Sequence, residues 1–111
     1  MDKSALDKIK NIEQRFFEVE KLMSDPKNAS DVQKITKLAK EHSELKKIVN
    51  LYQEINNKSY QLKDLQIIIK EENDSELIDL AKEDVLSLEK DIESLNEDLQ
   101  EQLIPKDVRD K

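Results

Sequence analysis

The sequence has no glycine, cysteine or tryptophan and only two prolines among its 111 residues. Sandwiches, barrels, dinucleotide-binding folds and P-loops need glycine where the backbone turns tightly or approaches a phosphate, so these classes are excluded. The lack of cysteine excludes disulfide frameworks, zinc knuckles and thiol nucleophiles. The longest apolar run, Ile67 to Ile69, is far shorter than the roughly 20 residues that span a bilayer. We therefore expect a soluble, unexported protein of the cytoplasm that does not bind membranes.

Apolar residues are sufficient for a core and are regularly spaced. Leu, Ile, Val and Phe make up 32 of the 111 residues, which is above the level of roughly 20% typical of disordered chains. They recur in alternating steps of three and four, the spacing of one helical face. This periodicity predicts helices over 4–24, 31–72 and 75–103. The three stripes are Ala5, Ile9, Ile12, Phe16, Val19 and Met23; Ile35, Leu38, His42, Leu45, Val49, Tyr52, Ile55, Leu62, Leu65 and Ile69; and Ile78, Ala81, Val85, Leu88, Ile92, Leu95 and Leu99.

Local signals define the ends of the first two helices. The residue before a proline is disfavoured in the helical region, so Pro26 predicts the end of the first helix and a loop over 24–30. Ser30 followed by Gln33 is a capping-box pattern, which predicts the start of the second helix. Pro105 ends regular structure after the third helix.

The second helix is predicted to be unusually long. Its stripe continues past Tyr52 with a phase slip beside Asn56–Ser59, four residues of indifferent or poor helix propensity. We expect one helix of about 42 residues, about 60 Å long, bent or loosened at the slip. A clean break into two helices is the alternative. Asp74 or Ser75 is predicted to cap the third helix.

The expected fold is all-α: an antiparallel three-helix bundle, coiled-coil-like, with a long second helix. None of the three helices is stable alone in water, but each can bury its stripe against the other two. We expect a single domain over 1–104. Residues 105–111 are predicted to be a charged linker toward a missing domain.

Charge is unevenly distributed along the chain. Residues 25–63 carry a net charge of +3, whereas residues 64–111 carry −10. One interpretation is a solvated face with weak interhelical pairs. The other is an acidic docking face for a basic partner. Direct reading of nucleic acid is not expected, because phosphates are repelled and only four Phe and Tyr residues could stack on bases.

Candidate functional residues are few, and all are candidates for partner contact. Leu86 lies off the apolar stripe of the third helix, and Glu93 and Glu97 belong to its acidic ladder. His42 is the only histidine and is interpreted as a polar member of the core. One histidine without cysteine supplies no zinc or di-iron ligand set. We expect no catalytic residue, cofactor or metal, and no enzymatic activity.

Several short motifs resemble a known family across essentially the whole chain. These motifs are Leu22–Pro26, Glu41–Leu45, Tyr52, Asp74–Leu77 and Leu103–Asp107. In them the chain resembles the N-terminal domain of a bacterial class I peptide chain release factor, of the type that reads UAA and UAG stop codons. Val108 stands where the family often has a proline.

The resemblance implies a non-catalytic fragment that works by contact. The family's codon-reading Pro-x-Thr and hydrolysis-triggering Gly-Gly-Gln motifs do not occur in this sequence. The implied partners are the stalk-base region of the large ribosomal subunit and a GTPase release factor, and the isolated domain is expected to be monomeric. The alternative is a free-standing homodimeric coiled-coil adaptor or chaperone-like protein. Sedimentation separates the two hypotheses.

Overall fold

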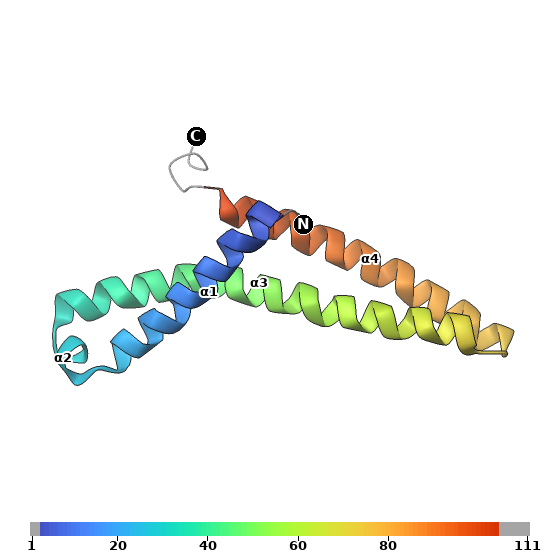
Figure 1. Cartoon of the computed structure of the whole chain (residues 1–111), viewed down its shortest axis with the longest axis horizontal. Coiled ribbons are helices and arrows are strands. Elements are labelled where there is room, and N and C mark those ends of the chain that lie inside the picture. The colour runs from blue at the N-terminus through green and yellow to red at the C-terminus, as the bar shows by residue number, and fades with distance from the viewer. Residues whose placement is uncertain (1–2, 105–111) are drawn as a thin grey trace. The chain divides into compact units, whose positions relative to one another are not determined.

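The computed structural model of the chain describes residues 3–104, and all regular structure within this range is helical (Figure 1). The helices are α1 (Lys3–Ser24), α2 (Pro26–Ala29), α3 (Val32–Glu71) and α4 (Ser75–Leu103). The predicted all-α bundle with a long second helix is confirmed. The ends of α1, α3 and α4 agree with the predicted ends to within one residue. The predicted linker over 105–111 lies outside the described residues.

The chain divides into two compact units, Met1–Asn50 and Leu51–Lys111, and α3 contributes one half to each. The apolar stripe of α3 changes phase beside Asn56–Ser59, so no single face of this helix is apolar along its whole length. Each half therefore has its own packing face. Because α3 is one continuous helix of 40 residues, the alternative of a clean break is wrong. One domain over 1–104 stays a prediction.

The first unit consists of α1, α2 and the first half of α3 (Figure 1). The predicted stripe of α1 is buried or half-buried at every position, as is the part of the α3 stripe that lies in this unit. Ile48 is also buried although the stripe did not include it, because a packing face is wider than two positions per heptad. The buried residues of this unit are Ile9, Phe16, Val19, Ile48 and Val49.

The predicted loop over 24–30 contains a single helical turn, α2. Pro26 is its first residue. At this position a backbone N–H would have no acceptor within the helix, and the fixed φ of proline suits a helix. Asp25 caps this turn, and its carboxylate accepts a hydrogen bond from the Lys27 backbone N–H at 3.0 Å. The Asn28 side chain donates to the Leu22 carbonyl at 3.0 Å, which ties the turn to the end of α1. Proline thus ends one helix and starts the next.

The cap of α3 differs from the predicted capping box. The Asp31 carboxylate accepts a hydrogen bond from the Lys34 backbone N–H at 3.2 Å, whereas the Ser30 hydroxyl donates to the Lys27 carbonyl at 3.2 Å. Ser30 is already used as the C-cap of α2, so it is not available at the start of α3. The neighbouring carboxylate caps α3 instead.

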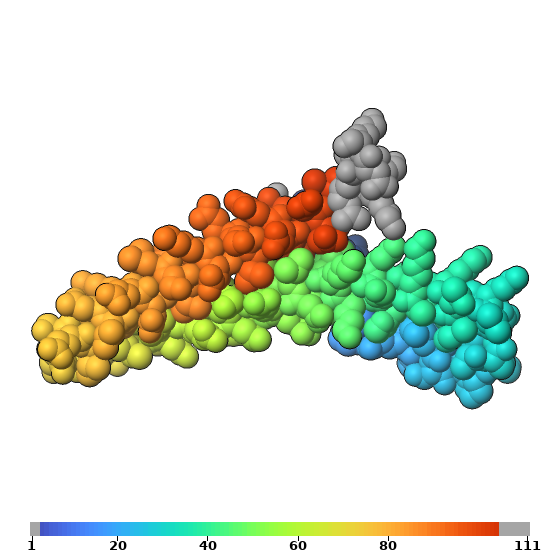
Figure 2. All heavy atoms as spheres, turned by 180° about the vertical axis from the view of Figure 1, so that it is seen from behind, coloured from blue at the N-terminus to red at the C-terminus, as the bar shows by residue number. Residues whose placement is uncertain are grey.

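The second unit is a helical hairpin in which α4 lies alongside the second half of α3 (Figures 1 and 2). Every position of the predicted α4 stripe is buried or half-buried, with Ala81 and Leu99 the most enclosed. The Lys58 ammonium and the Asp91 carboxylate form an ion pair of 3.5 Å between the two helices. Leu51 lies outside the predicted stripe of α3 but is half-buried, so the packing face is wider at this position. Ile67, Leu80 and Leu86 also lie outside the predicted stripes, and they are exposed.

Carboxylates form the turn between α3 and α4. Glu72 accepts hydrogen bonds from the backbone N–H groups of Asn73 and Asp74, at 3.0 and 3.2 Å. Asp74 caps α4 by accepting from the Glu76 N–H at 2.9 Å, which selects it over Ser75. No described residue has a positive φ. The turn therefore needs no glycine, because acidic side chains satisfy the backbone donors that the turn leaves free.

Candidate partner-binding surface

The three candidate contact residues lie on one side of α4. Spacings of seven and four residues separate Leu86, Glu93 and Glu97, which places them on the same helical face. All three are exposed, and 62% of Leu86 is accessible to solvent. Within residues 3–104 neither glutamate takes part in an ion pair. Their charges are therefore available to a partner, and their role in binding stays a prediction.

The structure brings Glu93 and Glu97 together with a third glutamate around a groove of about 460 Å³ between α3 and α4. Leu62 and Ile92 supply its apolar part, and Leu86 lies outside it. The full lining is Leu62, Glu89, Ile92, Glu93, Asn96, Glu97 and Gln100. Three carboxylates beside apolar side chains form a surface suited to a cationic group with an aliphatic stem.

Asn96 is a groove residue that the sequence reasoning missed. Its Oδ1 atom is buried and has no hydrogen-bond partner within the described part of the chain. Buried polar atoms are normally satisfied, so an unpaired acceptor is unusual. In the sequence, the only indication of this residue is its position: Asn96 directly follows the stripe residue Leu95, in a helix interior where asparagine is a weak helix former.

The net negative charge of the described residues lies in the second unit. Its described residues, 51–104, carry 15 acidic and 5 basic side chains, a net charge of −10. The described residues of the first unit, 3–50, carry 8 acidic and 11 basic side chains, a net charge of +3. Such an asymmetry attracts basic partners to the second unit and repels phosphates from it.

A polar cluster joins α1 to α3 in the first unit. The Arg15 guanidinium donates two hydrogen bonds to the Glu41 carboxylate, at 2.7 and 2.8 Å, and a third to Glu18 at 2.9 Å. These hydrogen bonds to Arg15 lower the pKa of Glu41, with its positive charge adding to the effect and partial desolvation opposing it. The same hydrogen bonds raise the pKa of Arg15, which is cationic in any case. The cluster fixes the two helices in register.

His42 occupies a structural position in the same unit. Its ring stacks on Phe16 with centroids 4.7 Å apart and planes inclined by 23°. Its Nε2 atom lies 3.2 Å from the Glu20 carboxylate. This half-buried, partnered position fits the interpretation of His42 as a polar member of the core. Among residues 3–104 no three acidic or histidine side chains are grouped closely enough to hold a metal ion.

None of the described helices is both long enough and apolar enough to cross a membrane.

Comparisons with known proteins agree with the resemblance found in the sequence. The peptide chain release factor 1 of Bacillus subtilis is 37% identical over 105 residues, which cover 95% of this chain and 30% of that protein. The same factor of Bacillus licheniformis gives the same values, and that of Staphylococcus epidermidis is 32% identical over 104 residues, 94% of this chain and 29% of the relative. The chain thus spans about a third of the length of these curated relatives. No solved structure matches it.

The family assignment follows from the match to a domain model. The model of the PCRF domain matches residues 12–111, which include most of α1 and all of α2, α3 and α4. This match covers the helices that carry the polar cluster, the acidic groove and the capped hairpin turn. The chain belongs to the PCRF domain family.

Proposed function

We propose that this chain is the contact domain of a peptide chain release factor, and that it acts in translation termination by binding the ribosome. The proposal places its contacts at the stalk-base region of the large subunit and on a GTPase release factor. The observation that carries it is the net charge of −10 on the exposed surface of the second unit, in a chain whose relatives are release factors. A strongly acidic surface favours basic protein partners.

The proposal assigns no catalytic step to this chain. His42 is held between Phe16 and Glu20, and the glutamates of α4 lie on an exposed surface. Both arrangements support a role in packing and recognition. We place this function in the cytoplasm, where translation termination takes place in bacteria.

Co-sedimentation with purified bacterial large ribosomal subunits tests the proposal. The chain is expected to pellet with the subunits at low salt and to be released as the ionic strength rises, because surface charges are screened. Full-length release factor 1 of Bacillus subtilis is expected to compete with it. The variant Leu88→Asp places a charge in the apolar stripe of α4 and is expected to disrupt the packing. It serves as the control that shows whether unfolded chain also pellets with the subunits. Absence of pelleting, or pelleting that the full-length factor does not reduce, would contradict the proposal.

Binding to the GTPase release factor is tested separately with the purified protein. Immobilised chain is expected to bind it with an association rate that falls steeply with salt. The double variant Glu93→Gln/Glu97→Gln is expected to bind more slowly than the double variant Lys34→Gln/Lys37→Gln, which removes two exposed charges of the other sign from the first unit. Equal rates for both variants would count against the acidic surface as the contact.

We further propose that the isolated chain is monomeric. A monomer is expected in sedimentation equilibrium at micromolar concentration, with a melting temperature that does not depend on concentration. A dimer whose melting rises with concentration would instead support a homodimeric coiled-coil adaptor.

A further inference from the structure

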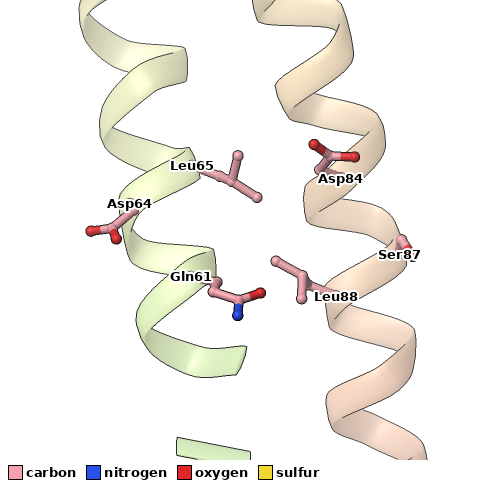
Figure 3. A pocket seen from close by; sticks show the side chains of 6 residues that line it. All are labelled: Gln61, Asp64, Leu65, Asp84, Ser87 and Leu88. Atoms are coloured by element: carbon pink, nitrogen blue, oxygen red, sulfur yellow. The ribbon is translucent and has the colours of Figure 1, made fainter. Parts of the chain in front are cut away.

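A second groove lies between the second half of α3 and α4, within the hairpin unit (Figure 3). Its volume is about 450 Å³. Leu65 and Leu88 point toward each other from the two helices and form an apolar floor, and the Asp84 side chain lies beside them (Figure 3). Asp64 lies at the outer edge on α3. The complete lining is Gln61, Asp64, Leu65, Asp84, Ser87 and Leu88.

Exposed apolar side chains continue this floor toward the hairpin turn. Ile68 follows Leu65 by three residues, and Leu80 precedes Asp84 by four, so each lies one helical turn further along the same side of its helix. Ile68 is 43% exposed and Leu80 57% exposed. Large aliphatic side chains that are left in water next to a groove mark a surface for binding.

The opposite end of the groove is polar. Lys58 precedes Gln61 by three residues, and Asp91 follows Leu88 by three, so their ion pair of 3.5 Å crosses from α3 to α4 one turn beyond the groove. The apolar floor is therefore limited to about two helical turns, between this ion pair and the hairpin turn.

The charge around the groove determines the chemistry of its occupant. No basic side chain is among its lining residues, whereas two aspartates are, and the described part of the unit carries a net charge of −10. Phosphates of nucleic acids and anionic lipid headgroups are repelled by such a surface. An occupant must therefore combine aliphatic side chains with positive charge.

We propose that this groove binds a basic amphipathic helix of a protein partner. Leu65 and Ile68 are about one helical turn apart, and this separation matches that of side chains i and i+4 on an incoming helix. Aliphatic side chains of the partner lie on Leu65, Leu88, Ile68 and Leu80, and its lysines or arginines pair with Asp64 and Asp84. The inference rests on the proposed function, because it names the chemistry of a partner that a contact domain would bind.

Synthetic peptides test the inference on the full chain without ribosomes. A fluorescent peptide of about 18 residues has leucine at helical i, i+3, i+4 and i+7 spacing and lysine elsewhere. A second peptide replaces leucine by alanine, and a third replaces lysine by glutamate. Anisotropy titration is expected to show binding of the first peptide and dissociation constants at least about tenfold higher for the other two. Equal binding of the alanine peptide would mean unspecific attraction of a polycation and would overturn the inference.

Substitutions in the chain locate the binding. Ile68→Ser/Leu80→Ser is expected to raise the dissociation constant about tenfold or more through lost apolar contact. Asp64→Asn/Asp84→Asn is expected to raise it about threefold and to reduce its salt dependence. Because Ile68, Leu80, Asp64 and Asp84 are exposed, the helical content measured by circular dichroism should not change.

Matched controls lie away from both grooves. Val32→Ser removes an exposed aliphatic side chain in the first unit, and Glu83→Gln/Glu101→Gln removes two exposed charges of α4 that line neither groove. Both are expected to leave the dissociation constant within about twofold of the unmodified chain. A control that weakens binding as much as the groove variants would overturn the proposed site, as would tighter binding of labelled single-stranded RNA or phosphatidylserine vesicles than of the leucine–lysine peptide.

The peptide titration and the ribosome sedimentation test the two proposals independently of each other. If the peptide does not bind while the chain still pellets with large subunits, the groove inference is wrong and the proposed function stands. If the peptide binds to the groove but the chain does not pellet, the proposed function is wrong and the groove remains a site for basic helices.

Discussion

The sharpest test of the packing compares the same substitution at a buried and an exposed valine. Val19 in α1 is fully buried, with 0% exposure, whereas Val32 in the first turn of α3 is 76% exposed. Replacing Val19 by alanine removes two buried carbon atoms at about 0.8 kcal/mol each, and the remaining cavity adds to this loss. The higher helix propensity of alanine stabilises the variant by about 0.5 kcal/mol. The expected loss in free energy of unfolding is therefore about 1.5–2 kcal/mol.

Urea unfolding followed by circular dichroism at 222 nm measures this difference. With a slope of about 2 kcal/mol per molar urea, Val19→Ala should lower the midpoint by about 0.8–1 M. Val32→Ala should leave the midpoint unchanged or raise it slightly, because only the propensity term applies at an exposed site. Equal midpoints for the two variants would refute the assignment of Val19 to the core of the fold.

Three further predictions concern the helix cap, the polar cluster and the acidic surface. Asp74→Ala should lower the free energy of unfolding by about 1 kcal/mol, measured by thermal melting, because it removes the cap of α4. Arg15→Gln should raise the pKa of Glu41 toward its usual value in an NMR titration, because the guanidinium that lowers this pKa is lost. Glu93→Lys/Glu97→Lys in a full-length factor should slow association with basic partners and flatten its salt dependence, while the circular dichroism stays unchanged.

The pH dependence of the polar cluster has a defined sign. The folded-state pKa of Glu41 is lowered, so its stabilising contribution is fully present above the unfolded-state pKa and is lost as the pH falls through the folded-state value. In Arg15→Gln this acid-dependent loss should shrink. An unchanged Glu41 titration in the variant would contradict the role of Arg15.

The helix cap has a matched control. An Asp74→Asn variant should retain most of the stability that Asp74→Ala loses, because asparagine is an equally good cap.

Most of the fold could be predicted from the sequence because helical periodicity is a local signal. All stripe positions of α4, from Ile78 to Leu99, are buried or half-buried as predicted. The ends were accurate because proline and capping carboxylates act over a few residues. The failures were also local: both Ser30 and Asp31 can cap a helix, and only the use of Ser30 in α2 decided between them.

The division into two units was not predicted, although its cause is visible in the sequence. The phase slip beside Asn56–Ser59 predicts a bend or loosening of α3, whereas its larger effect is that the two halves of the helix have different packing faces. Periodicity within a helix does not say which other helix covers a given face. For the same reason the candidate contacts Leu86, Glu93 and Glu97 could be found as exposed residues, but the grooves could not, since they need side chains from two helices.

The boundary between the units has a consequence for dissecting the protein. Domain boundaries usually fall in exposed linkers that proteases cut, whereas the boundary between these two compact units falls between Asn50 and Leu51, in the interior of α3. The non-helical connections lie at Asp25, at 30–31 and at 72–74, so cleavage there would release α1 or α4 rather than either unit. Limited digestion is therefore expected to release whole helices and not the two units. A gene segment that encodes only one of the units would have to divide α3 in its interior.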